Sequence, residues 1–517
     1  MRSISSMKNA VSAMAANILT ILFGFFAQKV FINTLGIEYL GLNSLFNNIV
    51  TMLGVVELGL GTAIVYHLYK PIKENDKEKV KLLMNFYKGA YRVIAMIVLA
   101  IALVLVPFLD RIIGENSIDN NIYFIFMLYI IDVILTYLFT YKRSILYADQ
   151  KIYITNLIHM LYIIFMNVFQ IAFLLIVHNF ILYLVIKITF RALENIVINR
   201  IINKKYSYIK EKTTDKLDKN TKKDIYTKIK GLLFHKLGGF LVLGVDNIII
   251  SMEPSLGLTA VGMYSNYSMV LTAVSNLFGQ AFLSITANIG NLLVEKNSEK
   301  TYKTYKNVLM MNFWVYSFAS ISIFCIMQPF IELIYGAEFL FDQTVLGVLV
   351  LRFYILGMRK TYTGFKDAAG IFYEDRFVPI IESVLNIGFA LILVKFLGLS
   401  GIFIAGIISS FALYAYSYPV FIYKGIFKQK ISEYIKENIM YLIVTAINLF
   451  VTLFLINLIN VDNLILRIII NGVMCVIIPN TICFVIFRKT EEFKYMKNVI
   501  SIIIGKFSAK GAKKKVS

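Results

Sequence analysis

Long apolar runs, separated by short polar segments, recur along the whole sequence. A run of about 20 residues can cross a hydrocarbon core about 30 Å thick as an α-helix. The pattern predicts about 14 such helices, with boundaries read from the charged interruptions. They cover approximately residues 9–34, 39–67, 89–109, 121–141, 152–177, 180–200, 231–252, 257–291, 307–335, 343–365, 377–396, 399–423, 438–459 and 463–487. We therefore predict an all-α polytopic membrane protein.

Composition supports this prediction. Of the 517 residues, 58% are hydrophobic and only 16% are charged, whereas about a quarter of the residues of a soluble domain are charged. The three cysteines lie inside apolar runs, and neither they nor the four histidines show metal-ligand spacing. No phosphate-binding Walker loop and no nucleophile elbow is present. We expect no metal, no cofactor and no enzymatic activity.

The distribution of lysine and arginine predicts the orientation. Basic residues gather in the loop after the second predicted helix and in the segment 204–230, whereas the loops on the other side are short and poor in lysine. Because basic segments accumulate in cytoplasmic loops, both termini are predicted to be cytoplasmic. The net charge of +21 is spread over these loops. Topology therefore explains it better than a nucleic-acid partner does.

An internal repeat organises the chain. Residues 35–41 (Leu-Gly-Ile-Glu-Tyr-Leu-Gly) resemble residues 256–262 (Leu-Gly-Leu-Thr-Ala-Val-Gly) at an offset of 221 residues. The same offset relates Ser44 to Ser265, Thr51 to Thr272 and Glu74 to Glu295. A basic loop follows the second helix of each copy, so both copies have the same orientation in the membrane. The sequence thus predicts a parallel repeat of six plus six helices.

The repeat predicts the domain organisation. A six-helix N-terminal lobe (1–203) precedes a basic cytoplasmic linker (204–230) and a six-helix C-terminal lobe (231–424). Two additional helices (425–488) and a basic cytoplasmic tail (489–517) follow. Two such lobes are expected to form a V-shaped transporter with a central cavity at their interface.

Charged side chains inside predicted helices are the candidates for the binding site. Such groups are costly in a bilayer, so they face a cavity or a partner. Guanidinium and ammonium groups suit an anionic substrate such as a pyrophosphate. The candidate cavity cations are Arg352, Lys187, Arg191, Lys29, Arg359 and Lys360. The alternatives are that those near helix ends extend to the interface, and that Glu194 simply pairs with Arg191.

Four acidic residues also fall within predicted helices. Asp132, Asp246, Glu57 and Glu382 are candidates to bind a coupling proton or sodium ion. Each is equally suited to be the buried counter-ion of an arginine or a lysine. The sequence does not identify their partners.

Three segments near the N-terminus resemble a known family. Residues 35–42 (Leu-Gly-Ile-Glu-Tyr-Leu-Gly-Leu), 57–64 (Glu-Leu-Gly-Leu-Gly-Thr-Ala-Ile) and 68–71 (Leu-Tyr-Lys-Pro) look like the first two helices of Wzx-type polysaccharide flippases. These belong to the multidrug/oligosaccharidyl-lipid/polysaccharide exporter (MOP) superfamily. The motif-level similarity is concentrated in residues 35–71, and the rest is similar in helix number and duplication.

The resemblance implies a MATE-like fold and a function. The chain would flip an undecaprenyl-pyrophosphate-linked oligosaccharide from the cytoplasmic to the outer leaflet of a bacterial inner membrane, for capsule or O-antigen (lipopolysaccharide) biosynthesis. Its partners would be that glycan, membrane lipid, a polysaccharide polymerase and glycosyltransferases. The alternatives are a multidrug exporter of the same superfamily, a peptidoglycan-precursor flippase and, with less support, a membrane glycosyltransferase or polymerase.

Overall fold

The computed structural model describes residues 21, 23–57, 60–211, 215, 217–295, 297–459, 461–499 and 501, and only the backbone of residues 62, 228–243 and 280–288. Half of the predicted helix 9–34 lies outside these residues, and its described part, residues 21 and 23–34, is helical. The last sixteen residues of the predicted basic tail also lie outside them. The chain divides into two compact units, residues 1–265 and 266–517.

The first unit contains a helix for each predicted span. Its helices are α2 (Ile37–Leu53), α3 (Leu60–Lys73), α4 (Lys77–Leu105), α5 (Leu109–Ile113), α6 (Ile122–Ala148), α7 (Ile152–Val177), α8 (Phe180–Lys205) and α9 (Lys219–Met252), and α10 (Gly257–Val294) begins in it. Three short 3-10 turns, η1 (Gly54–Glu57), η2 (Val106–Phe108) and η3 (Ser207–Lys210), complete it. Three spans differ clearly from the prediction. The span 39–67 is divided into α2 and α3, and α4 and α9 begin 12 residues before the predicted starts at 89 and 231. The turn η1 begins at Gly54, and glycine is a poor helix former.

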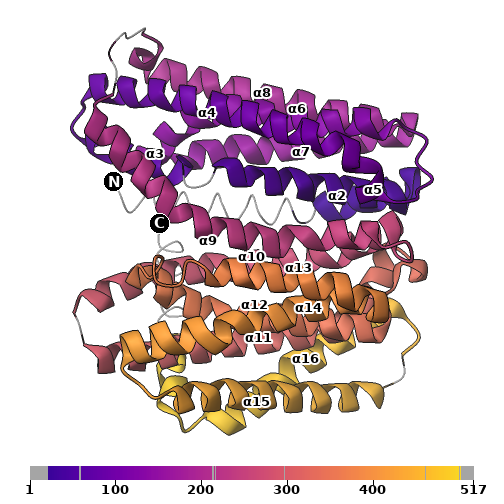
Figure 1. Cartoon of the computed structure of the whole chain (residues 1–517). Coiled ribbons are helices and arrows are strands. Elements are labelled where there is room, and N and C mark those ends of the chain that lie inside the picture. Colours follow the sequence, from indigo (N-terminus) through magenta and orange to yellow (C-terminus); the bar gives the residue numbers. More distant parts are fainter. Residues whose placement is uncertain are drawn as a thin grey trace, which may run out of the picture. The chain divides into compact units, whose positions relative to one another are not determined.

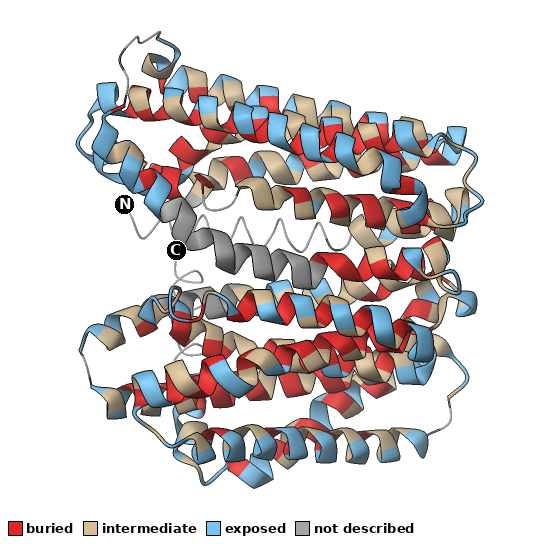
Figure 2. Cartoon of the chain, viewed as in Figure 1, coloured by how far each residue is buried: buried red, intermediate tan, exposed pale blue. Residues whose placement is uncertain are grey.

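In this first unit α4, α6 and α8 lie side by side, and α7 packs on α8 (Figure 1). Large apolar side chains such as Met96, Leu103 and Ile176 are exposed, whereas Asp132 and Glu194 are buried. Figure 2 shows exposed residues recurring along the helices of this unit. A soluble protein would have the opposite distribution. The outer faces are therefore suited to lipid.

The second unit holds the rest of α10, then α11 (Ser298–Ile334), η4 (Ala337–Phe339), α12 (Gln343–Ala369), α13 (Val378–Leu397), α14 (Leu399–Ala412), the π-helix η5 (Leu413–Phe427), α15 (Ile431–Asn457) and α16 (Leu464–Phe487). The hairpin of α13 and α14 turns at Gly398, whose φ of +54° favours glycine. α16 packs on α11 and α15.

Nine helices in the described part of the chain are long and apolar enough to cross a membrane. Neither α8 nor α12 is among these nine. Each has three charged side chains near its middle. These are Lys187, Arg191 and Glu194 in α8, and Arg352, Arg359 and Lys360 in α12. The architecture is an all-α, polytopic membrane fold, as the sequence predicted.

The two copies of the repeat touch within the first unit. Ser44 Oγ on α2 donates a hydrogen bond to Ser265 Oγ on α10, at 2.8 Å and a sequence separation of 221. A Cβ added to Gly41 would overlap the carbonyl oxygen of Leu258, and one added to Gly262 would overlap that of Ile37. Ile37 and Leu258 are also 221 residues apart. Such reciprocal contacts are what a local two-fold relation between α2 and the start of α10 produces.

Candidate functional site

The central helix of the candidate site is α8, which carries two of the predicted cations on one face. Lys187 Nζ lies 3.6 Å from Asp132 Oδ2 of α6 and 3.2 Å from Asn47 Oδ1 of α2. Arg191, one turn further along α8, places Nε 3.4 Å from Asp132 Oδ1. The two side chains are only 17% and 20% exposed. Asp132 therefore bridges both cations inside the first unit.

The same network continues through Glu194. Arg191 Nη1 is 3.2 Å from Glu194 Oε2, and Arg143 Nη2 of α6 is 3.4 Å from Glu194 Oε1. His159 Nδ1 of α7 is 3.0 Å from the same Oε1. Because the Glu194 side chain is fully buried, these contacts replace the water that a carboxylate needs. The predicted pair of Arg191 and Glu194 is present, within a larger cluster.

Aromatic rings line the two α8 cations. Lys187 Nζ lies 4.8 Å from the centroid of the Tyr129 ring, and the Arg191 guanidinium lies 4.7 Å from that of Tyr162. A ring face attracts a cation, and the attraction strengthens away from water. Together these groups hold both cations on the inner side of α8, so neither extends into lipid. We call Asp132, Arg143, His159, Lys187, Arg191 and Glu194 the α8 cluster.

The α8 cluster carries a net positive charge. It contains three positive side chains, Lys187, Arg191 and Arg143, and two negative ones, Asp132 and Glu194. His159 adds a further positive charge when it is protonated. An excess of positive charge in partly buried positions favours an anionic ligand over a cationic one. The arrangement can therefore bind a phosphate-bearing group.

Three members of this cluster were not among the predicted site residues: Arg143, His159 and Glu194, the last of which was expected only as a partner of Arg191. The four histidines were considered only as metal ligands, and Arg143 lies just beyond the predicted helix 121–141. One sequence signal points to Arg143, since it follows Asp132 by 11 residues, which is about three helical turns. His159 has no such signal, because its contact with Glu194 joins two different helices.

In the second unit, Arg359 and Glu382 form a two-pronged ion pair. Nη1 of Arg359 is 2.5 Å from Oε1 of Glu382, and Nη2 is 3.1 Å from Oε2. Arg359 Nε also donates to the Tyr418 hydroxyl at 3.2 Å. The pair joins α12 to α13 and η5. Glu382 is thus placed as a counter-ion of Arg359.

The other two predicted site cations of α12, Arg352 and Lys360, face neighbouring helices. Arg352 is 5% exposed, and a Cβ added to Gly406 on α14 would lie 2.5 Å from its Nε. Its guanidinium lies 5.9 Å from the centroid of the Phe403 ring. Lys360 Nζ donates to the Ser275 carbonyl of α10 at 3.1 Å. Both cations thus lie against other helices of the second unit.

The remaining predicted residues lie on other helices than the α8 cluster, whose members belong to α6, α7 and α8. Glu57 accepts a hydrogen bond of 2.5 Å from the Tyr91 hydroxyl of α4. Asp246 is 3% exposed on α9, and Lys29 lies partly exposed on the helix 23–35. Among the described residues, no group of three or more His, Cys, Asp or Glu side chains is placed to hold a metal ion.

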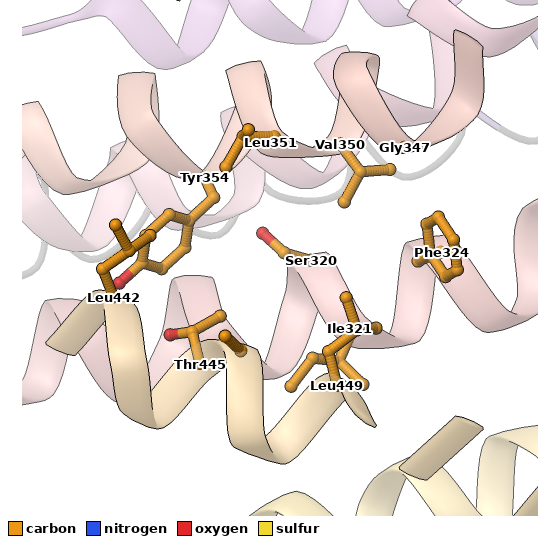
Figure 3. Close-up of a pocket in the computed structure, with 11 residues that line it drawn as sticks. Ser320, Ile321, Phe324, Gly347, Val350, Leu351, Tyr354, Leu442, Thr445 and Leu449 are labelled. Atoms are coloured by element: carbon orange, nitrogen blue, oxygen red, sulfur yellow. The ribbon is translucent and has the colours of Figure 1, made fainter. Parts of the chain in front are cut away.

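An apolar cavity of about 160 Å³ lies in the second unit between α11, α12 and α15 (Figure 3). Its walls include Phe324, Val350, Tyr354 and Leu442, with the hydroxyl-bearing Ser320 and Thr445. It carries no charged side chain. This cavity can take a hydrocarbon group and cannot neutralise an anion.

The Arg359–Glu382 pair makes a thermodynamic prediction. Arg359→Gln and Glu382→Gln should each lower the free energy of unfolding by about 3 kcal/mol, because each leaves a buried charge without its partner. The double variant should lose less than the sum of the two. Unfolding of the detergent-purified chain in a denaturing detergent measures all three values. Additive losses would contradict a direct pair.

Comparison with known proteins identifies the fold. No protein-family model matches the sequence, and no curated protein matches it. The structure is similar to the lipid II flippase MurJ in an inward closed conformation, with a TM-score of 0.63 and 14% identity, over 92% of this chain and 99% of that one.

Two further solved structures share this fold. An inward-facing MATE family multidrug resistance transporter of the MOP superfamily gives a TM-score of 0.57 at 15% identity, over 78% of this chain and 96% of that one. A MOP superfamily transporter from Pyrococcus furiosus gives 0.51 at 15% identity, over 80% and 93%. The chain therefore has the MATE-like transporter fold.

Proposed function

We propose that the chain is a membrane transporter of the MOP superfamily that flips a pyrophosphate-bearing, lipid-linked oligosaccharide to the outer leaflet. The observation that carries the proposal is the net positive α8 cluster inside a bundle with the MATE-like fold. Lys187 and Arg191 are held inward by Asp132, Tyr129 and Tyr162. Guanidinium and ammonium groups in such surroundings bind phosphate strongly.

The mechanism follows from the charges. The pyrophosphate competes with Asp132 for Lys187 and Arg191, so binding exchanges one set of ion pairs for another. This exchange offsets part of the cost of stripping water from the headgroup. The lipid tail stays in the bilayer while the headgroup crosses by alternating access. A membrane potential that is negative inside drives a negative charge outward, by about 2.3 kcal/mol per charge at 100 mV.

Two observations favour a flippase over the multidrug exporter. A cationic drug would require an excess of acidic groups, whereas cations exceed carboxylates in the α8 cluster. The match to the lipid II flippase extends over 92% of this chain, compared with 78% for the MATE transporter. The same match makes a peptidoglycan-precursor flippase the second candidate. The residues 35–71 favour the polysaccharide branch.

A flipping assay tests the proposal. The full chain is reconstituted in proteoliposomes with a fluorescent polyprenyl-pyrophosphate glycan, and a membrane-impermeant quencher reports the flipped fraction. Arg191→Gln and Lys187→Gln should each slow flipping about 10- to 100-fold, because each removes a charged hydrogen-bonding group. Lys300→Gln is the control, because Lys300 pairs with Glu295 at an exposed site. Unchanged flipping in both α8 variants would refute the proposal.

The substrate is distinguished in the same assay. A capsule or O-antigen repeat unit and lipid II are supplied in parallel arms at equal concentration. Faster flipping of the repeat unit supports the polysaccharide assignment, and faster flipping of lipid II supports the second candidate. Flipping of a cationic dye but of neither lipid would identify a drug exporter.

A further inference from the structure

We propose that a second anion site lies on the first unit, at Lys142, and binds the phosphate of an anionic glycerophospholipid in the cytoplasmic leaflet. We call it the Lys142 site. It goes beyond the proposed function, because it is separate from the α8 cluster. Arg143 faces Asn195 and Glu194 of α8, whereas the adjacent Lys142 faces Asn199 and Asn203, further along the same helix.

The immediate partners of Lys142 are neutral. Its Nζ donates to the amide oxygens of Asn199 and Asn203, the latter at 3.0 Å. The amide of Asn203 donates in turn to Asn199 Oδ1 at 3.2 Å, which fixes the two oxygens. An ammonium group has three N–H donors, and among the described residues these two amides are its hydrogen-bond acceptors. One donor therefore stays available for a ligand.

The charged neighbours of Lys142 are positive. Lys88 of α4 and Lys210 of η3 act on it electrostatically, and η3 packs on both α4 and α8. The nearby carboxylates are engaged elsewhere, since Glu211 pairs with Lys81 and Asp149 with Lys151. Among the described residues, none of the three ammonium groups of Lys88, Lys142 and Lys210 forms an ion pair with a carboxylate. Such a group repels itself unless an anion joins it.

The surrounding surface identifies the anion as a lipid. On α4, Lys88, Arg92 and Met96 follow one another at intervals of four residues, and Met96 is 61% exposed. On α6, the exposed Leu138 lies one turn before Lys142, and on α8 Ile196 is exposed one turn before Asn199 and Arg200. Residues four apart share a helix face. The basic side chains at these helix ends can bind the phosphate headgroup of a lipid, and the exposed apolar side chains next to them can contact its acyl chains.

The orientation of the chain agrees with this ligand. Lys142 lies in the last two turns of α6, and η3 follows α8 in the chain and packs on α8 and α4. The sequence predicts that this side faces the cytoplasm. Anionic lipids in the cytoplasmic leaflet attract basic side chains near the membrane surface. A free phosphate ion would make no use of the exposed apolar surface.

Lipid titration followed by native mass spectrometry tests the proposal on the detergent-purified full chain. Phosphatidylglycerol should bind, and phosphatidylcholine should bind much more weakly. Lys142→Gln should weaken phosphatidylglycerol binding about fivefold, and the double variant Lys88→Gln/Lys210→Gln about 25-fold. Lys70→Gln is the matched control, since Lys70 is a highly exposed lysine of the same unit, 3.9 Å from Glu74.

The outcomes are distinct. Lys88 and Lys210 are exposed, so their variants should fold even if Lys142→Gln does not. Equal phosphatidylglycerol affinity in the parent and the double variant would overturn the site. Equal affinity for glycerol phosphate and phosphatidylglycerol would overturn the lipid assignment and leave a free phosphate as the ligand. The flipping assay with these variants separates this proposal from the proposed function, because they leave Lys187 and Arg191 intact.

Discussion

Replacing Gly41 by alanine is expected to lower the free energy of unfolding by about 3 kcal/mol or more. The added Cβ would overlap the carbonyl oxygen of Leu258. A backbone carbonyl within a helix cannot move aside as a flexible side chain can, so α2 and α10 would have to separate. Thermal unfolding of the purified chain measures the loss.

Two further variants make the Gly41 test specific. Gly262→Ala should destabilise by a similar amount, because its Cβ would overlap the carbonyl oxygen of Ile37 in the reciprocal contact. Gly89→Ala on α4 is the control, since no atom lies within 4 Å of its added Cβ. It should be neutral or stabilising by up to about 1 kcal/mol. Equal stability of all three variants would show that the α2–α10 crossing is not close-packed.

Replacing Glu194 by glutamine is expected to lower the free energy of unfolding by about 3–5 kcal/mol. The change keeps the size of the side chain and removes the negative charge that Arg143, His159 and Arg191 share. Arg191 would keep Asp132, and Arg143 would keep only the amide of Asn195. Denaturation of the purified chain, monitored by tryptophan fluorescence or circular dichroism, measures the loss.

An exposed carboxylate provides the comparison. Glu295→Gln removes a salt bridge to Lys300 in which both side chains are more than half exposed, and should change stability by less than about 1 kcal/mol. A similar small effect for Glu194→Gln would mean that the α8 cluster does not depend on its buried carboxylate. A loss in both variants would point to a general effect of charge removal.

The helices were predictable because each one satisfies its own backbone hydrogen bonds, and apolar length alone decides whether it can span a bilayer. Every predicted span has a helix among the described residues. The similarity of residues 35–41 to residues 256–262 was also visible in the sequence, and the structure joins Ser44 and Ser265, which share its offset, by a hydrogen bond. The spacing of Lys187, Arg191 and Glu194 also placed them on one face of α8 before any tertiary contact was known.

The partners of those charges were decided only by tertiary structure. Within the α8 cluster, Asp132 and Arg143 come from α6 and His159 comes from α7. In the second unit, Glu382 of α13 pairs with Arg359 of α12. A side-chain contact between helices depends on how the helices rotate and pack, and many packings satisfy the same apolar pattern. The sequence therefore determined which segments span the membrane and where charges enter them. Folding determined which charges neutralise each other.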